Sequence, residues 1–255
     1  MIFDTHAHYY DDAFDPDRDA LLSSLPERGV ALVVCPGCDL ESSEQSIALA
    51  EQYPFLYAAA GYHPENLEGV DLADVDQIKA LCAHQKVVAV GEIGLDYYWD
   101  EAPRDVQKEW FVRQLELAWE MSLPVIIHSR DAAADTLQIM QSHARGLMGV
   151  IHCFSYSKEL AREYVKMGFF IGVGGVVTFK NGRRLKEVVE DIPLSSIVLE
   201  TDCPYLAPVP NRGKRNSSLN LPYVVKEIAE IKGISCEEVM AQTEKNAKIL
   251  YGMRD

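Results

Sequence analysis

The run Val88-Ala89-Val90-Gly91-Glu92 places a carboxylate directly after an uninterrupted apolar segment. Continuous apolar runs of this kind are typical of strands in a parallel sheet that helices cover on both faces. Seven other segments share this character. Eight strands are therefore predicted, at Ile2–His6, Ala31–Pro36, Leu56–Tyr62, Val87–Gly91, Pro124–His128, Gly149–Cys153, Phe169–Val173 and Ser196–Thr201.

Between these strands, apolar residues recur at spacings of three and four, which predicts helices. The expected helices are Pro16–Arg28 (a weaker pattern), Leu40–Tyr53, Asp71–His84, Asp105–Met121, Asp131–His143, Ser157–Met167 and Arg183–Asp191. After the eighth strand, helices are expected at Leu221–Lys232 and Cys236–Gln242, with a closing segment at Thr243–Tyr251. Ser235 and Glu238 have the spacing of a capping box. Eightfold strand–helix alternation predicts an α/β fold, a (β/α)₈ TIM barrel.

The length of 255 residues is usual for one such barrel, and no linker or low-complexity tract divides the chain. Residues 1–255 are therefore expected to form a single domain. A doubly wound open sheet is the structural rival, but no Gly-x-Gly-x-x-Gly turn follows the first strand.

The net charge of −15 argues against a non-specific duplex binder, which would need a broad basic face. It does not exclude a phosphate-bearing substrate, because bound cations reverse the field in a small cleft. The six cysteines are scattered, and neither an export signal nor an apolar run of membrane-spanning length is evident. A cytoplasmic protein is expected, without membrane contact or an obligate protein partner.

Ionisable residues gather where the predicted strands end. In a TIM barrel these ends form the active-site face, so their side chains are expected to converge. His6 and His8 are two residues apart, so an extended strand projects both rings to the same side. Burying such groups is costly unless they are paired or bind a metal. The candidate metal ligands are His6, His8, Glu92, His128, His152 and Asp202.

Six ligands are more than one tetrahedral ion uses. Two ions about 3.5–4 Å apart, bridged by a carboxylate, fit this number and are typical of two-metal hydrolases. Glu92 is the natural bridge, because carboxylates bridge readily and imidazoles do not. Mixed nitrogen and oxygen ligation without a thiolate leaves zinc, manganese and magnesium open.

The motifs around these residues resemble those of the TatD family of metal-dependent deoxyribonucleases, within the amidohydrolase-type barrel superfamily. They span almost the whole chain, at Phe3–His8, Gly61–Pro64, Gly91–Tyr97, Pro124–Asp131, Ile151–Ser155, Leu199–Pro204 and Arg212–Asn216. The resemblance implies that His6, His8 and Asp202 hold one metal and that His128 and His152 hold the other, with Glu92 between them. It also implies hydrolysis of DNA phosphodiesters, typically from an exposed end of a single strand.

The chemistry of such a centre predicts further roles. Glu92 and Asp202 are predicted as catalytic carboxylates, with Asp202 also accepting a proton from the attacking water. Glu200 is expected either to hold a ligand histidine or to form a buried salt bridge. His63 is expected either to donate to a phosphate oxygen or to cap its loop. The candidates for a phosphate clamp are Arg130, Arg212 and Arg215.

The sequence departs from the family pattern in two loops. Asn216 is followed by Ser217-Ser218 where an acidic residue and a proline are usual, and Tyr156 stands where a glycine is common. These loops are expected at the mouth of the site, so the departures affect the expected size and preference of the substrate.

Two other functions are compatible with the ligand pattern. A hydrolase of the same architecture could cleave an amide, lactone or ester, but relatives of that kind often bridge their metals with a carboxylated lysine. Here Glu92 occupies that position, and the basic loop Arg212–Asn216 favours a phosphate. A non-catalytic binding protein is the third reading, and the intact ligand set argues against it.

Overall fold

A computed structural model describes residues 1–253. Its eight strands are all parallel, and each pairs with the strand that follows it in the chain. The strands are β1 (Ile2–Asp4), β2 (Val30–Pro36), β3 (Leu56–Ala60), β4 (Val87–Asp96), β5 (Val125–Arg130), β6 (Gly149–Ile151), β7 (Phe170–Val173) and β8 (Ile197–Leu199).

The first and last strands close the sheet into a barrel. Both the backbone N–H and the hydroxyl of Thr5 donate to the carbonyl of Leu199, each at 2.9 Å. Just beyond the strand ends, Ala7 and Cys203 form an isolated parallel bridge. The (β/α)₈ barrel expected from the sequence is thereby confirmed.

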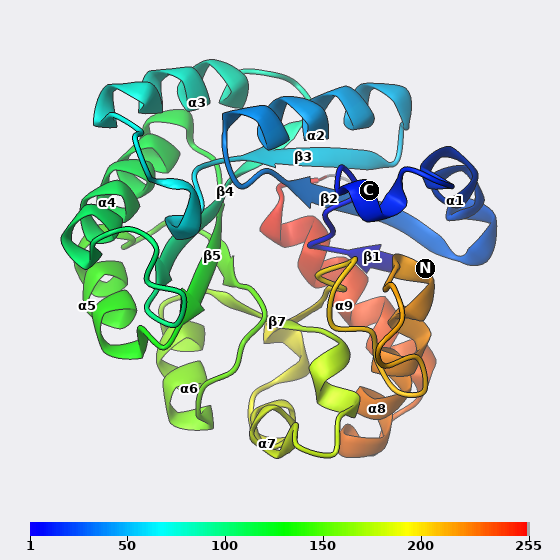
Figure 1. The fold of residues 1–255 in the computed structure, drawn as a ribbon. Helices are drawn as coiled ribbons and strands as arrows, with labels where there is room; N and C mark the ends of the chain where they lie inside the picture. The colour runs from blue at the N-terminus through cyan, green and yellow to red at the C-terminus, as the bar shows by residue number, and fades with distance from the viewer. Residues whose placement is uncertain (254–255) are drawn as a thin grey trace.

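The helices surround the strands, except that α9 passes behind the barrel in the view of Figure 1. They are α1 (Arg18–Ser24), α2 (Leu40–Gln52), α3 (Val75–Cys82), α4 (Arg104–Met121), α5 (Ala133–His143), α6 (Lys158–Lys166), α7 (Arg183–Asp191), α8 (Leu221–Lys232) and α9 (Cys236–Leu250). Short 3₁₀ turns lie at Asp12–Phe14, Pro26–Arg28, Pro64–Asn66, Leu72–Asp74, Gly175–Thr178, Leu194–Ser196 and Ser218–Asn220. Among residues 1–253, no helix is long and apolar enough to span a membrane.

Three helix predictions need correction. The segment Pro16–Arg28 is not one helix, because Pro26 ends α1 and begins a separate 3₁₀ turn. Likewise Asp71–His84 divides into a 3₁₀ turn and α3. Cys236–Gln242 and Thr243–Tyr251 are one continuous helix, since no glycine or proline separates them. The capping box of Ser235 and Glu238 at the start of this helix is confirmed.

One buried side chain from each strand joins a cluster that fills the barrel. Its strand members are Phe3, Val34, Ala59, Ala89, Ile126, Val150, Phe170 and Val198. The end of α9 packs against this cluster through Ala247, Leu250 and the neighbouring Tyr251. The Tyr251 hydroxyl donates to the carbonyl of Thr5 at 2.8 Å. The last helix therefore secures the strand that leads to His6.

The strand β4 continues five residues beyond its predicted end at Gly91. Its pairing with β5 is irregular between Val90 and Ile93 and then resumes through Asp96. Gly94 makes this possible, because its φ is +146° and a Cβ there would lie 1.9 Å from the carbonyl oxygen of His128. As a result, Glu92 and Asp96 both belong to the strand and are both buried.

Candidate metal centre

The six predicted ligands come together at the carboxyl ends of the strands. His6 and His8 follow β1, Glu92 lies in β4, and His128 lies in β5. His152 directly follows β6, and Asp202 follows β8. Ligand atoms lie within 4.8 Å of one another in three overlapping sets, namely His6 with His152 and Asp202, His6 with His8 and Glu92, and Glu92 with His128 and the additional His63. Residues almost two hundred positions apart thus form one cluster because the barrel brings all its strand ends to one face.

Glu92 lies at the centre of this cluster, and its two oxygens face different histidines. Oε1 lies 2.8 Å from His152 Nε2 and 2.9 Å from His128 Nδ1. Oε2 lies 3.2 Å from His6 Nε2 and 3.8 Å from His8 Nε2. A carboxylate arranged in this way can serve two groups of nitrogen ligands at once.

Asp202 lies on the Oε2 side of Glu92. Its Oδ1 is 3.4 Å from His8 Nε2 and 3.8 Å from His6 Nε2. The Asp202 side chain is 18% exposed, whereas that of Glu92 is 4% exposed. Asp202 is therefore the carboxylate of this set that solvent reaches more readily.

The hydrogen bonds of His8 prepare its ring for a cation. Its Nδ1 lies 3.2 Å from the carbonyl oxygen of Pro36, which can only accept a proton. Neutral His8 therefore carries its hydrogen on Nδ1 and its lone pair on Nε2, the atom that faces the other ligands. Imidazole and carboxylate donors without a thiolate suit a hard or borderline divalent cation.

Burial and neighbouring charges set the protonation of the cluster. Burial opposes ionisation of Glu92, but the imidazoles of His152, His6 and His63 outweigh it and hold the pKa of this carboxyl well below its usual range. Burial lowers the pKa of His6 to about 4, so its ring is neutral. An ionised carboxylate and a neutral imidazole are the forms that bind metals.

Comparison with known proteins shows the family to which this chain belongs. The model of the family described as TatD related DNase matches residues 3–252. The chain belongs to the TatD family of metal-dependent hydrolases. The resemblance found in the sequence motifs is thus confirmed, as is an enzyme that hydrolyses ester bonds.

Relatives match this TatD-family chain along its whole length. The Bacillus subtilis (strain 168) protein named "Uncharacterized metal-dependent hydrolase YabD" is 44% identical, with 98% of this chain and 99% of that protein covered. The Cronobacter sakazakii protein named "3'-5' ssDNA/RNA exonuclease TatD" is 34% identical, with 98% and 97% covered. The solved structure of the Escherichia coli TatD homologue YjjV aligns with a TM-score of 0.92 at 32% identity, covering 99% and 98%.

In this TatD-family protein, His63 caps its loop, whereas its donation to a phosphate oxygen stays a prediction. Its Nδ1 accepts the backbone N–H of Glu65 at 3.2 Å and so caps the loop. The ring hydrogen of neutral His63 must then be on Nε2, which lies 3.5 Å from Glu92 Oε1. Burial lowers the pKa of His63 to about 3, which keeps the ring neutral. His63 thus presents an N–H donor to the cluster.

Asp96 is a site residue that was not predicted from the sequence. This buried carboxylate lies 2.9 Å from His128 Nε2 through its Oδ2. Its other oxygen accepts the backbone N–H groups of Tyr98 and Trp99, each at 2.9 Å. Glu92 and Asp96 are four residues apart, so on one strand their side chains point to the same face. If β4 had been predicted to continue past Gly91, this spacing would have identified Asp96 as a site residue.

Asp4 was also missed, although it fixes the strand that leads to His6. Its carboxylate accepts the backbone N–H and the hydroxyl of Thr201, at 3.0 and 2.7 Å, and the hydroxyl of Ser218 at 2.6 Å. Burial raises the pKa of Asp4 to about 6. Asp4 therefore ties the end of β1 to the segment after β8 that carries Asp202.

The two departures from the family pattern have structural roles. Ser218, besides its bond to Asp4, lies 2.8 Å from the hydroxyl of Tyr9 through its own hydroxyl. The hydroxyl of Tyr156 lies 3.0 Å from Ser129 Oγ and accepts the N–H of Ala132 at 3.2 Å. Each substituted side chain thus fastens a loop at the carboxyl face.

Glu200 lies beside His152, as expected, but does not form a hydrogen bond with it. The distance from Glu200 Oε1 to His152 Nδ1 is 3.9 Å, and Oε1 instead accepts the N–H of Cys153 at 2.5 Å. Burial raises the pKa of Glu200 to about 8. Gly172 leaves room for this carboxyl, since a Cβ there would lie 2.3 Å from its Oε2. Support of the ligand His152 by Glu200 stays a prediction.

The three arginines predicted to bind phosphate contact other groups in the described chain. The guanidinium carbons of Arg130 and Arg212 lie 3.9 Å from the ring centroids of Tyr98 and Phe179, respectively. Arg215 donates two hydrogen bonds of 2.7 Å to the carboxylate of Asp17. Within residues 1–253, Arg130 and Arg212 form no ion pair with a carboxylate, whereas Arg215 would have to break its ion pair with Asp17 before it could bind phosphate. Their phosphate contacts stay predictions.

Proposed function

We propose that this TatD-family hydrolase is a deoxyribonuclease that removes nucleotides from exposed ends of single-stranded DNA. The observation that carries the proposal is the position of Glu92 between two groups of histidines, which suits a carboxylate that bridges two cations. The name of the Cronobacter relative supports a nucleic-acid substrate.

Two divalent cations, of zinc, manganese or magnesium, would divide the ligands at Glu92. His6, His8 and Asp202 lie on the side of Oε2. His128 and His152 lie on the side of Oε1. When bound, such ions neutralise charge on the phosphate and lower the pKa of water so that it can attack phosphorus.

The protein's own groups supply the remaining steps. Asp202 is the proton acceptor, since it is more exposed than Glu92 and its neighbours hold its pKa low against the effect of burial. His63 Nε2–H donates to a non-bridging phosphate oxygen, which gains negative charge as water attacks. Asp96 holds the ring of His128, and Glu200 holds the backbone of the loop that begins at His152.

The surroundings of the site also support this reading. Arg130 and Arg212 offer guanidinium groups for backbone phosphates, because neither forms an ion pair within the described residues. All six cysteines are free thiols, as is usual in the reducing cytoplasm, where we propose that the protein acts. No obligate protein partner is proposed.

The test is hydrolysis of single-stranded DNA labelled at either end by the metal-reconstituted protein, alongside a panel of amides and lactones. We expect a ladder that grows from one DNA end and disappears in EDTA. His128→Ala should abolish the ladder, because it removes a ligand on the Oε1 side of Glu92.

Two outcomes would overturn the proposal. Turnover restricted to amides or lactones would assign the site to the amidohydrolase-type alternative. Tight oligonucleotide binding without turnover of any substrate would indicate a binding protein that retains the barrel.

A further inference from the structure

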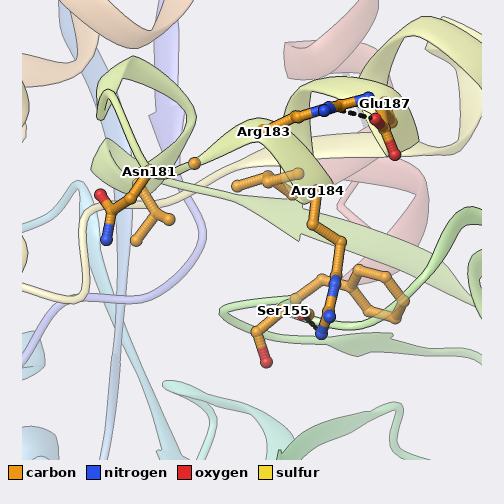
Figure 2. Close-up of a pocket in the computed structure, with 9 residues that line it drawn as sticks. Ser155, Asn181, Arg183, Arg184 and Glu187 are labelled. Carbon is orange, nitrogen blue, oxygen red and sulfur yellow. Dashed lines mark hydrogen bonds and ion pairs between the residues drawn. The ribbon is translucent and has the colours of Figure 1, made fainter.

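A cavity of about 660 Å³, whose lining residues Figure 2 shows, lies between the segments that follow β6 and β7 at the carboxyl ends of these strands. One wall is formed by Phe154 and Ser155, two and three residues after the ligand His152. The opposite wall is formed by Asn181 and the first residues of α7. Its volume is within the range of about 300–1,000 Å³ that is usual for ligand sites.

This cavity contains an arginine without a carboxylate partner. Arg183 donates to Glu187 at 2.8 Å. Arg184 instead extends toward Ser155, whose carbonyl oxygen lies 3.5 Å from its Nη1 (Figure 2). Among residues 1–253, Arg184 forms no ion pair, although the chain carries 39 acidic residues and only 24 basic ones. Arg184 is exposed at this cavity, so its guanidinium is free to pair with an anionic ligand there.

A second basic loop adjoins this cavity. The guanidinium of Arg212 stacks on the ring of Phe179, and the N–H of Val209 donates to Thr178 Oγ1 at 2.9 Å. These contacts hold the loop after β8 against the segment that leads into α7. The unpaired cation Arg212 therefore lies against the segment that leads into α7 and Arg184.

The backbone adds hydrogen-bond donors. Gly182 precedes α7 and offers no side chain to cap its first N–H groups. A Cβ at this position would lie 2.2 Å from the carbonyl oxygen of Val176, so a capping serine or aspartate does not fit. The first turn of α7, which lines the cavity, thus keeps donors available for an oxyanion.

We propose that this cavity binds a phosphate of the nucleic-acid strand other than the one being cleaved. This inference rests on the proposed function and adds a second contact to it. Arg184 supplies the charge, and the first turn of α7 supplies N–H donors. Because the subsite needs a linkage beyond the scissile one, a strand of several nucleotides should react more efficiently than a dinucleotide.

The experiment measures kcat/KM of the metal-loaded enzyme on a twelve-nucleotide thymidine strand and on a thymidine dinucleotide with one phosphodiester. Losing one phosphate contact on a single strand lowers the slope of log affinity against log salt by about 0.7. Arg184→Gln should therefore lower kcat/KM for the long strand about fourfold at about 0.15 M salt. The ratio of kcat/KM for the long strand to kcat/KM for the dinucleotide should fall. The slope of log kcat/KM for the long strand against log salt should become shallower by about 0.7.

Two matched variants separate this subsite from a general effect of charge. Arg145→Gln makes the same charge change at an exposed arginine between α5 and β6, on the amino-terminal side of the barrel, and should leave the ratio unchanged. Glu187→Gln frees Arg183 and removes an anion from the cavity, so it should raise the ratio.

The outcomes distinguish the two proposals. Equal effects of Arg184→Gln and Arg145→Gln, or a lower ratio in Glu187→Gln, would overturn the subsite while leaving the nuclease function in place. A wild-type enzyme that hydrolyses neither DNA substrate would overturn the proposed function, and the subsite with it.

Discussion

Asp96 Oδ2 lies 2.9 Å from His128 Nε2, on the opposite side of the imidazole from Glu92. The ring is therefore held between two buried carboxylates of the same strand. Burial opposes the charge on His128, but the bonds to Asp96 and Glu92 outweigh it and raise its pKa to about 9. Asp96 thus fixes the orientation of a ring that would ligate a metal.

Asp96→Asn should lower metal affinity and hydrolysis about 10–100-fold, the usual cost of losing a group that orients a ligand histidine. Competition with a chromophoric chelator would measure the affinity. Asp105→Asn, at an exposed residue in the first turn of α4, is the matched control. Unchanged metal affinity in Asp96→Asn would show that the ring is oriented without this carboxylate.

Ser218→Ala should lower the free energy of unfolding by about 1–3 kcal/mol, because it removes one buried hydrogen-bond partner from each of Asp4 and Tyr9. Urea denaturation would measure this change. Ser217→Ala is the control, since the Ser217 hydroxyl has no hydrogen bond in the described chain, and should cost less than about 0.5 kcal/mol. Equal losses in the two variants would contradict the role given to Ser218.

Glu238→Ala should destabilise the protein at neutral pH more than in acid. Hydrogen bonds from the N–H and hydroxyl of Ser235 hold the pKa of Glu238 below its ordinary 4.5. A lowered carboxyl pKa gives stability that is present above the ordinary pKa and lost as pH falls through the lowered one. Thermal melts should show Tm falling by about 1–3 °C at pH about 7, and by less at pH about 3.

The control for this capping bond is Glu237→Ala, the neighbouring exposed acid in the first turn of α9. It removes a charge at the same helix terminus but no capping bond, so its effect on Tm should be smaller. If Glu238→Ala lowers Tm equally at both pH values, ionised Glu238 is not the form that caps α9.

Most of the barrel was predictable because buried parallel strands leave continuous apolar runs that alternate with amphipathic helices. The errors lie where a local contact decides the boundary. Pro26 divided a predicted helix, and the absence of a breaker near Thr243 joined two others. The continuation of β4 depends on Gly94 passing close to the backbone of His128, a tertiary contact that periodicity does not show.

At the site, too, residues marked by the strand pattern were predictable, whereas those decided by a local or tertiary contact were not. His6, Glu92 and His128 were predictable because ionisable groups at the ends of apolar strands are rare unless they have a function. Asp96 was not predicted because the fourth strand was expected to end at Gly91, whereas β4 extends to Asp96. Arg215 was predicted as a phosphate ligand by its residue type, whereas its pairing with Asp17 arises from a loop conformation that the sequence pattern does not contain.

The central claim, a pair of cations bridged by Glu92, is tested most directly by counting divalent ions in protein purified without added metal. Elemental analysis should find two equivalents in the wild type and a loss of occupancy in His6→Ala and His128→Ala, on opposite sides of the carboxylate. Both variants should keep the circular dichroism spectrum of the barrel. A wild-type protein with one equivalent and full hydrolytic activity would contradict the account.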